Sequence, residues 1–298
     1  MFQGFELERI DLGDVTLRVR HGGSGPPVLL LHGHPRTHAT WHKVAPLLAD
    51  SFTVVCPDLR GYGESSQPQE LPDHASYSKR AMAGDCAELM SRLGHESFVV
   101  VGHDRGAYVA TRLALDHAES VVGAVIMDGV PIVERLERCD AKFASAWWHW
   151  FFFGQTEKPA ERLISADPDA WYQADAKQMG PEAYEDLRRA LHNPDVVHAM
   201  LEDYRAGIRI DREHEEADRA AGRRIMCPVL LVWAGRDDTE ELYGDPRPIW
   251  EAWANDVTGL RLDSGHHMAE EVPEELAAAI REFGAESCFS PKASRSSR

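Results

Sequence analysis

Short, fully apolar runs alternate with amphipathic segments along most of this chain, and this alternation constrains its fold more than any other feature. Val28–Leu31 and Phe98–Val101 are typical of the runs, because neither has a polar face. Strands have this composition when helices cover both faces of a parallel sheet. Between the runs, segments such as Lys79–Leu93 carry apolar residues at helical spacing. We therefore predict an α/β fold with a mostly parallel sheet and helices on both of its faces.

The predicted elements are interrupted once, after Pro131. The expected strands are Val15–Arg20, Val28–Leu31, Thr53–Cys56, Phe98–Val101, Val122–Met127, Val229–Trp233 and Leu260–Leu262. The expected helices are Trp41–Leu48, Lys79–Leu93, Arg105–His117, Pro248–Ala254 and Pro273–Phe283. From about residue 132 to 224 the chain is mostly helical and rich in aromatic and charged residues. We expect 1–131 and 225–298 to form one α/β core, 132–224 to be an inserted helical cap, and the terminal SPKASRSSR to be a disordered tail.

Composition and charge exclude several classes of partner. The chain of 298 residues is 43% hydrophobic and 27% charged, which is ordinary for a globular protein with a sizeable core. Its formal net charge is -17, and it has no basic cluster of the kind that nucleic acid or an anionic membrane surface requires. A few local cations could still hold a small anionic molecule in a pocket.

The cysteines and the ends of the chain bear on its location. The five cysteines are scattered and form no C-x-x-C pair. This argues against a disulfide framework or a zinc site and favours a reducing cytoplasm. No signal-peptide pattern opens the sequence, and no apolar run is long enough to span a bilayer. We expect a cytoplasmic protein.

The stretch Gly102-His103-Asp104-Arg105-Gly106 lies between a predicted strand and a predicted helix. Taken alone, Asp104 fits an ordinary helix N-cap. The glycines two residues before and two residues after it favour a nucleophile elbow instead. Such a turn is so tight that larger side chains would clash, and it presents the central side chain above the sheet. The usual residue at the centre is serine, and here it is aspartate.

The order of residues along the chain supports a catalytic triad. In hydrolases with such an elbow, the nucleophile comes first, an acid follows and a histidine comes last. Asp128 and Asp237 each follow a predicted strand, and a histidine follows in DSGHHMAEE. Upstream, the HGHP loop carries His34 directly after a strand. The backbone N–H groups of His34 and of Arg105 are the expected oxyanion donors.

At this point the chain resembles a known family. The motifs HGHP, GHDRGA, MDGVP, the pair HW at 149–150, EDYRAG and DSGHHMAEE resemble those of the α/β-hydrolase-fold haloacetate (fluoroacetate) dehalogenases. The resemblance extends from about Phe5 to Phe283. Epoxide hydrolases and haloalkane dehalogenases share the HGxP and elbow motifs, whereas the Asp-Arg and His-Trp pairs are more specific. The resemblance implies an eight-stranded, mostly parallel sheet with an inserted helical cap, no cofactor and a homodimer.

The implied chemistry explains why the nucleophile is an aspartate. A serine that displaced a halide from carbon would be left as a stable ether, whereas a carboxylate forms an ester that water can hydrolyse. We expect Asp104 to displace the halide and a histidine to activate the water. His266 matches the Ser-Gly-His pattern of the resembled family, and His267 is interpreted as its loop neighbour. For the acid we favour Asp128, while Asp237 matches the position that most other hydrolases of this fold use.

The residues expected to bind substrate follow from the same resemblance. Arg105 offers a planar fork that suits a carboxylate. The resembled dehalogenases carry a second arginine one helical turn after the nucleophile, where this chain has Tyr108. Tyr108 can donate one neutral hydrogen bond, so we expect a weakened carboxylate site and leave turnover of fluoroacetate open. Arg36, in the HGHPRT loop, is a candidate to compensate for the missing charge.

By the same match, the halide donors are His149, Trp150 and Tyr204, whose N–H and O–H groups can face a small anion. The stretch around them is almost wholly aromatic, however, so a buried or interface helix is an alternative interpretation. No spacing of histidines and carboxylates indicates a metal site.

Two rival functions stay open. An epoxide hydrolase would use the same Asp104 and His266, with Tyr172, Tyr184 or Tyr204 protonating the epoxide oxygen. A non-catalytic ligand-binding protein of hydrolase fold is the second rival, and the intact triad argues against it. The sequence thus predicts a cofactor-independent, metal-free hydrolase that converts a haloacetate or a 2-haloacid to the hydroxy acid, with a small anionic substrate as its partner.

Overall fold

The computed structural model describes residues 1–157 and 159–289, so the expected disordered tail SPKASRSSR lies outside the described residues. Its centre is an eight-stranded sheet with the order β1-β2-β4-β3-β5-β6-β7-β8. β2 pairs antiparallel with β1 and with β4, and all other pairs are parallel. The predicted mostly parallel, eight-stranded sheet is therefore confirmed.

The strands have the following bounds: β1 Phe5–Asp11, β2 Thr16–Gly23, β3 Pro27–Leu31, β4 Thr53–Pro57, β5 Phe98–His103, β6 Val121–Met127, β7 Val229–Ala234 and β8 Val257–Leu262. The central strands alternate between two hydrophobic clusters, one on each face. In β3, for example, Leu29 and Leu31 face one cluster, whereas Val28 and Leu30 face the other. A strand needs an apolar residue at every position when both faces are covered in this way.

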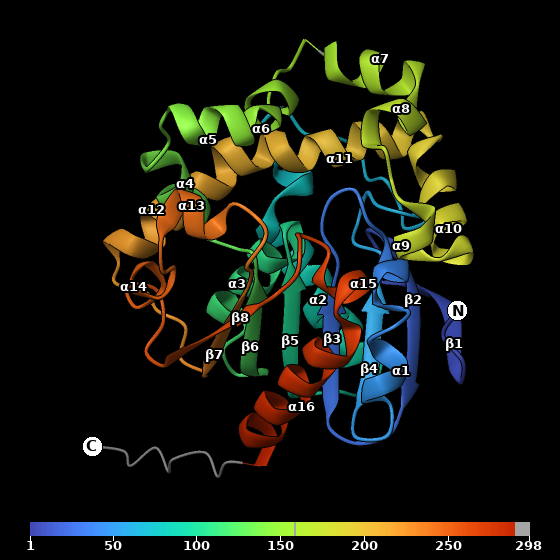
Figure 1. Ribbon diagram of the computed structural model, residues 1–298, viewed down its shortest axis with the longest axis vertical. Coiled ribbons are helices and arrows are strands. Elements are labelled where there is room, and N and C mark those ends of the chain that lie inside the picture. Colours follow the sequence, from blue (N-terminus) through green and yellow to red (C-terminus); the bar gives the residue numbers. More distant parts are fainter. Residues whose placement is uncertain (158, 290–298) are drawn as a thin grey trace.

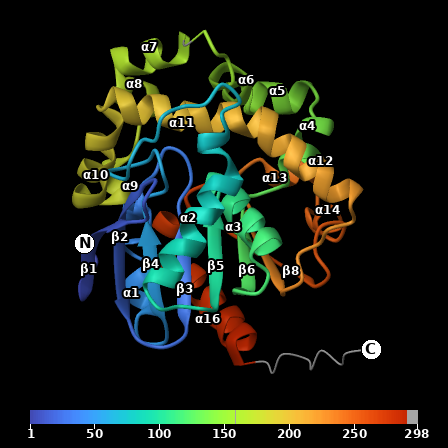
Figure 2. The ribbon, with the colours of Figure 1, turned by 180° about the vertical axis from the view of Figure 1, so that it is seen from behind.

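Helices cover both faces, as expected. α2 (Lys79–Arg92) and α3 (Arg105–Asp116) pack together on one face, and α1 (Ala45–Leu48) and α16 (Pro273–Phe289) pack on the other (Figures 1 and 2). The remaining helices of the core are the 3-10 helices η1 (His38–Trp41) and η2 (Ala75–Tyr77), α13 (Thr239–Tyr243), α14 (Arg247–Trp250) and α15 (Met268–Glu271).

Between β6 and β7 the described residues form helices and no strand. These are α4 Ile132–Glu137, α5 Ala141–Ala146, α6 Trp148–Phe153, α7 Pro159–Ala166, α8 Pro168–Tyr172, α9 Ala176–Met179, α10 Pro181–Leu191, α11 Pro194–Ala206, the π-helix η3 Gly207–Asp211 and α12 Arg212–Ala220. α11 runs across the edge of the sheet at which the parallel strands end, with α5 to α8 beyond it (Figure 1). We propose that this segment is the cap.

The structure differs from the sequence predictions at one strand and two helices. β1 was not predicted, because most of its side chains are exposed and it shows no apolar alternation. The expected helix Trp41–Leu48 is split into η1 and α1, and the expected helix Pro248–Ala254 shortens to α14. Pro46 and Pro248 fall within the first turns of α1 and α14, where proline is tolerated because its missing N–H would be unpaired anyway. Sequence periodicity alone does not define such short helices.

Cys56, Cys86, Cys139 and Cys227 are free thiols, and the side chain of Cys288 is not described. Among the helices of the described residues, none is both long and apolar enough to cross a bilayer.

Candidate active site

Asp104 occupies the turn between β5 and α3 in a conformation that few residues adopt, with φ 52° and ψ -116°. A Cβ atom at Gly102 would overlap the Gly106 carbonyl oxygen. A Cβ atom at Gly106 would lie 2.5 Å from the carbonyl oxygens of Leu31 and His32. Both flanking glycines are therefore required by close backbone contacts, as the elbow interpretation predicts. The strained backbone directs the Asp104 side chain above the end of the sheet.

The Asp104 carboxylate lies in a site prepared for negative charge. The backbone N–H of His34, from the loop after β3, donates a hydrogen bond of 2.8 Å to Asp104 Oδ1. Burial opposes ionisation of Asp104, but His266, His103 and Arg105 outweigh it and lower the pKa of Asp104 to about 2. The carboxylate is thus ionised at neutral pH and can act as a nucleophile.

His266 lies between Asp104 and two further carboxylates. Its Nε2 is 3.9 Å from Asp104 Oδ2. Its Nδ1 is 2.7 Å from Asp237 Oδ2 and 3.5 Å from Asp128 Oδ2. Burial lowers the pKa of His266, but hydrogen bonding to Asp128 and Asp237 and the charge of Asp104 raise it well above its usual value. The surroundings of His266 in the free enzyme therefore favour its protonated form.

Both candidate acids thus face the same nitrogen, and the choice of Asp128 stays a prediction. The distances favour Asp237, whose Oδ2 accepts the hydrogen bond from His266 Nδ1 at 2.7 Å, whereas Asp128 Oδ2 lies 3.5 Å away. Asp128 is fixed by its own contacts, because its Oδ1 accepts from the backbone N–H of Ala234 at 3.0 Å and from Thr239 Oγ1 at 3.4 Å. Asp128 also has a positive φ of 47°, so its position is built into the turn after β6.

Arg105 is fully buried and already has a partner that the sequence analysis did not identify. Its Nε and Nη2 donate to the Asp203 carboxylate at 3.0 and 2.9 Å, and Nη2 also donates to the Asp203 carbonyl at 2.8 Å. The guanidinium carbon lies 4.2 Å from the centroid of the Tyr204 ring. Nη1 has no acceptor. One nitrogen of Arg105 thus has no acceptor among the described residues, and the role of Arg105 in binding a carboxylate stays a prediction.

Asp203 could have been noticed in the sequence, because it immediately precedes Tyr204 in the quoted motif EDYRAG.

Tyr108 is buried edge-to-face against Trp150, with ring centroids 5.9 Å apart. Arg36, the candidate for compensation, pairs with Glu270 through its Nε at 2.8 Å and its Nη2 at 3.1 Å. Arg36 is therefore engaged elsewhere.

The three residues expected to bind halide are neighbours in the structure. The Tyr204 ring centroid is 5.8 Å from that of His149 and 5.9 Å from that of Trp150. Burial lowers the pKa of His149 to about 4, so this imidazole is neutral at pH 7. The indole N–H of Trp150 is buried and has no acceptor. A buried donor without an acceptor is rare, and an anion bound beside it would satisfy it.

A cavity of about 450 Å³ lies between the sheet and the cap, with Asp104 and His266 in its wall. The cap contributes an aromatic lining from α6, α8 and α11, including His149, Tyr172 and Tyr204. The Tyr172 hydroxyl is buried and has no hydrogen-bond partner among the described residues. From the sequence, Tyr172 was expected to act only in an epoxide hydrolase. The cavity combines a carboxylate nucleophile, an imidazole and neutral donors, which suits displacement followed by hydrolysis.

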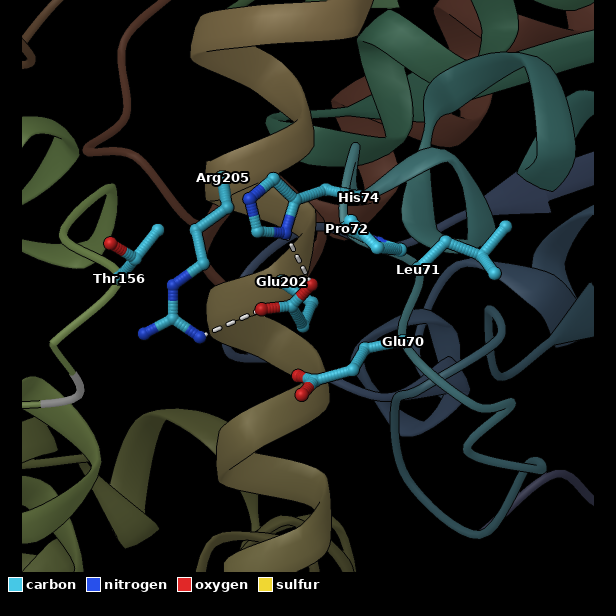
Figure 3. Close-up of a pocket in the computed structure, with 7 residues that line it drawn as sticks. All are labelled: Glu70, Leu71, Pro72, His74, Thr156, Glu202 and Arg205. Carbon is cyan, nitrogen blue, oxygen red and sulfur yellow. Dashed lines mark hydrogen bonds and ion pairs between the residues drawn. The ribbon is translucent and has the colours of Figure 1, made fainter.

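A second cavity, of about 230 Å³, contains a charged network (Figure 3). Glu202 lies at its centre and accepts hydrogen bonds from Arg205 at 2.8 Å and from His74 at 2.7 Å. Ligand atoms of Glu202, Glu70 and His198 lie within 4.8 Å of one another, close enough to hold one metal ion. At the active site, His103, Asp128 and His266 form another group of that kind. His266 Nδ1 already donates to Asp237, which makes it a poor ligand at that group.

Comparisons with known proteins agree with this geometry. The model of the alpha/beta hydrolase fold family matches residues 26–271. A fluoroacetate dehalogenase from Burkholderia sp is 42% identical over 291 residues, which cover 95% of each chain. A soluble epoxide hydrolase from Corynebacterium sp. (strain C12) is 32% identical over 263 residues, 85% of this chain and 87% of the relative. The crystal structure of ALR0039 from Nostoc sp PCC 7120 superposes with a TM-score of 0.92 at 44% identity, covering 95% of this chain and 99% of that chain.

Proposed function

Because the chain belongs to the alpha/beta hydrolase family, in its haloacetate dehalogenase-like branch, we propose that it hydrolyses the carbon–halogen bond of a 2-haloacid. The observation that carries this proposal is the indole N–H of Trp150, which is buried, has no acceptor among the described residues and lies beside His149 and Tyr204. A leaving halide needs such donors, and an epoxide leaves no anion of that kind.

In the first step, Asp104 Oδ2 attacks the carbon that bears the halogen, and the carbon–halogen bond breaks as the carbon–oxygen bond forms. The electron pair of the broken bond leaves with the halide, toward the donors His149, Trp150 and Tyr204. Asp104 Oδ1 stays on the His34 N–H, 2.8 Å away, which leaves Oδ2 free to attack. The product of this step is an ester of Asp104.

In the second step, His266 takes a proton from water, and the hydroxide attacks the carbonyl carbon of the Asp104 ester. Esterification removes the Asp104 charge, one of the charges that raise the pKa of His266, so His266 first releases its own proton to solvent and can then accept one from the attacking water. The backbone N–H groups of His34 and Arg105 hold the oxyanion. Collapse of the tetrahedral intermediate releases the 2-hydroxy acid and restores the Asp104 carboxylate.

The test is free halide released from chloroacetate, bromoacetate and fluoroacetate, with Asp104→Asn as the control. Release that disappears in the control supports the proposal. Release of chloride and bromide without fluoride would identify a dehalogenase whose carboxylate site is too weak for the strongest carbon–halogen bond. The absence of any halide would refute the proposal.

A second candidate is an epoxide hydrolase. Tyr172 and Tyr204 line the same cavity as Asp104, and the unpaired Tyr172 hydroxyl is a suitable proton donor for an epoxide oxygen. The 32% identity to the Corynebacterium enzyme also favours it. Diol formation from a panel of epoxides, with Tyr172→Phe as the diagnostic variant, separates this candidate from the first.

We also propose a homodimer that forms through the cap. Trp148 and Phe151 on α6 and Leu163 on α7 are large apolar side chains that stay exposed in the single chain, with Trp148 50% exposed. Sedimentation velocity on the wild type and on a Trp148→Ser variant tests this. A monomeric wild type would refute it.

A further inference from the structure

A second buried arginine lies near the active site, and no acid in the described part of the chain forms an ion pair with it. Arg135, on α4, is only 2% exposed. Within the described residues no carboxylate is in ion-pair contact with it, and Asp104 and Asp238 act on it only through their charge. Its Nη2 donates to the backbone carbonyl of Asp128 at 2.9 Å, and its Nε has no acceptor. Arg105, by contrast, is held by Asp203.

Aromatic rings surround Arg135. Its guanidinium carbon lies 4.9 Å from the centroid of the Trp147 ring, 5.7 Å from those of Trp150 and Tyr243, and 5.9 Å from that of Tyr108. These distances are within the range of cation–π attraction. Trp147 lines the cavity that contains Asp104. One ring therefore separates the Arg135 charge from the substrate cavity.

The two buried arginines meet at Tyr108 on α3. The Tyr108 side chain carries no charge, and α4 places Arg135 against its ring. Both buried guanidinium groups contact Tyr108 and Trp150, since the Arg105 guanidinium lies 5.4 Å from the Tyr108 ring and 5.2 Å from the Trp150 ring.

We propose that Arg135 is the second cation of the anion-binding site and adds its charge to that of Arg105. It is a positioning residue that acts through the rings of Trp147 and Trp150. On the proposed function, which this inference extends, Arg135 makes the cavity selective for a substrate that carries a carboxylate. It thereby disfavours a neutral substrate such as an epoxide.

The physical reason is the cost of burying a charge that no carboxylate contacts, a cost that Asp104 and Asp238 offset only from a distance. An arginine stays protonated even when it is buried, so the cost cannot be relieved by losing the proton. An anion bound in the cavity would relieve part of it. A cation against the face of an indole also withdraws electron density from the ring, which strengthens the N–H of Trp150 as a donor to an anion.

The charged groups that act on Arg135 come from three parts of the chain. Asp104 lies on the elbow, Asp238 precedes α13, and Asp128, whose carbonyl Arg135 contacts, follows β6. Asp104 loses its charge when it is esterified. The ester intermediate therefore has one negative charge fewer to balance Arg135, at a stage when the substrate carboxylate is still bound.

The test replaces Arg135 with residues that keep or remove the charge. Arg135→Met removes it with little loss of volume, and Arg135→Lys keeps it. Arg138→Met is the matched control, because Arg138 belongs to the same end of α4 but is exposed and pairs with Glu134. The double variant Tyr108→Arg/Arg135→Met moves the charge to α3. Readouts are KM and kcat for chloroacetate, and the affinity for acetate from quenching of tryptophan fluorescence.

We expect Arg135→Met to weaken acetate binding and to raise KM by about tenfold or more, since a nearby unit charge is worth at least that in a site of low dielectric. Arg135→Lys and the double variant should recover most of the affinity, and Arg138→Met should match the wild type. Unchanged acetate binding in Arg135→Met would overturn the proposal. So would a folded double variant that binds acetate no better than Arg135→Met.

Failure of the proposed function has a different signature. In that case the wild type releases no halide from any haloacid. Acetate binding still reports on Arg135 then, because it requires no chemistry. Acetate binding that depends on the charge, without halide release, would retain the cation site and reject the dehalogenase.

Discussion

Asp203 accepts hydrogen bonds from Nε and Nη2 of Arg105, so the arginine that follows the nucleophile is fixed before any substrate binds. Both side chains are fully buried, and they come from α11 of the cap and α3 of the core. Lys79 and the Tyr62 hydroxyl also bind the Asp203 carboxylate. This cluster of charges links the cap to the catalytic elbow.

Asp203→Asn is expected to destabilise the protein strongly. It removes the negative charge that compensates Arg105 and Lys79, and breaking a buried ion pair costs about 3–5 kcal/mol. The free energy of unfolding from urea denaturation measures this. Asp169→Asn is the matched control, because Asp169 pairs with Arg188 at the surface and such pairs are worth at most about 1 kcal/mol. Equal losses in the two variants would contradict the expectation.

The pKa of His266 is expected to fall in Asp104→Asn. Asp104 is one of three carboxylates that raise this pKa, and the substitution removes its charge. A raised pKa means that the imidazole stays protonated to higher pH in the wild type than in the variant. Titration of the His266 ring followed by NMR gives both midpoints. An unchanged midpoint would show that Asp104 does not act on His266.

The two steps of the reaction are expected to respond differently to pH. The pKa of Asp104 is about 2, so formation of the ester should persist as the pH falls to about 5. Hydrolysis of the ester needs neutral His266 and should slow as the pH falls. A rapid burst of halide followed by slow turnover at low pH would reveal this difference. A burst that disappears together with turnover would contradict it.

Asp237→Asn is expected to lower turnover more than Asp128→Asn does. Asp237 forms the hydrogen bond of 2.7 Å to His266 Nδ1, whereas Asp128 lies 3.5 Å away. With either acid removed, the other can still orient the ring, so only the double variant should lose hydrolysis of the ester completely. Single-turnover rates of ester hydrolysis in the three variants test this. A larger loss from Asp128→Asn would identify Asp128 as the triad acid.

Gly106→Ala is expected to lower the free energy of unfolding by about 1–3 kcal/mol, because its new methyl group would overlap the carbonyl oxygens of Leu31 and His32. Gly84→Ala serves as the control, since Gly84 lies inside α2 with open space around it. That change should stabilise the helix by about 0.5–1 kcal/mol. Chemical denaturation of both variants gives the comparison, and a stable Gly106→Ala protein would argue against the elbow geometry.

The sequence was most informative where local physics determines the structure. Gly102 and Gly106 indicated the elbow because a tight turn excludes side chains, and the apolar runs indicated the central strands. Arg105 and Asp203, in contrast, are 98 residues apart, and no local pattern links them. Arg135 was missed for the same reason, since its rings come from α3, the cap and α13. β1 was missed because an exposed edge strand needs no apolar face.

The account depends most on Asp104 forming an ester with the substrate. A single turnover of chloroacetate by excess enzyme in water enriched in oxygen-18 tests this directly, with mass spectrometry of the peptide that contains Asp104. The account predicts that one heavy oxygen enters the Asp104 carboxylate and that the first glycolate formed carries none from the solvent. Heavy oxygen in glycolate alone would mean that water attacks the substrate directly, and would contradict the account.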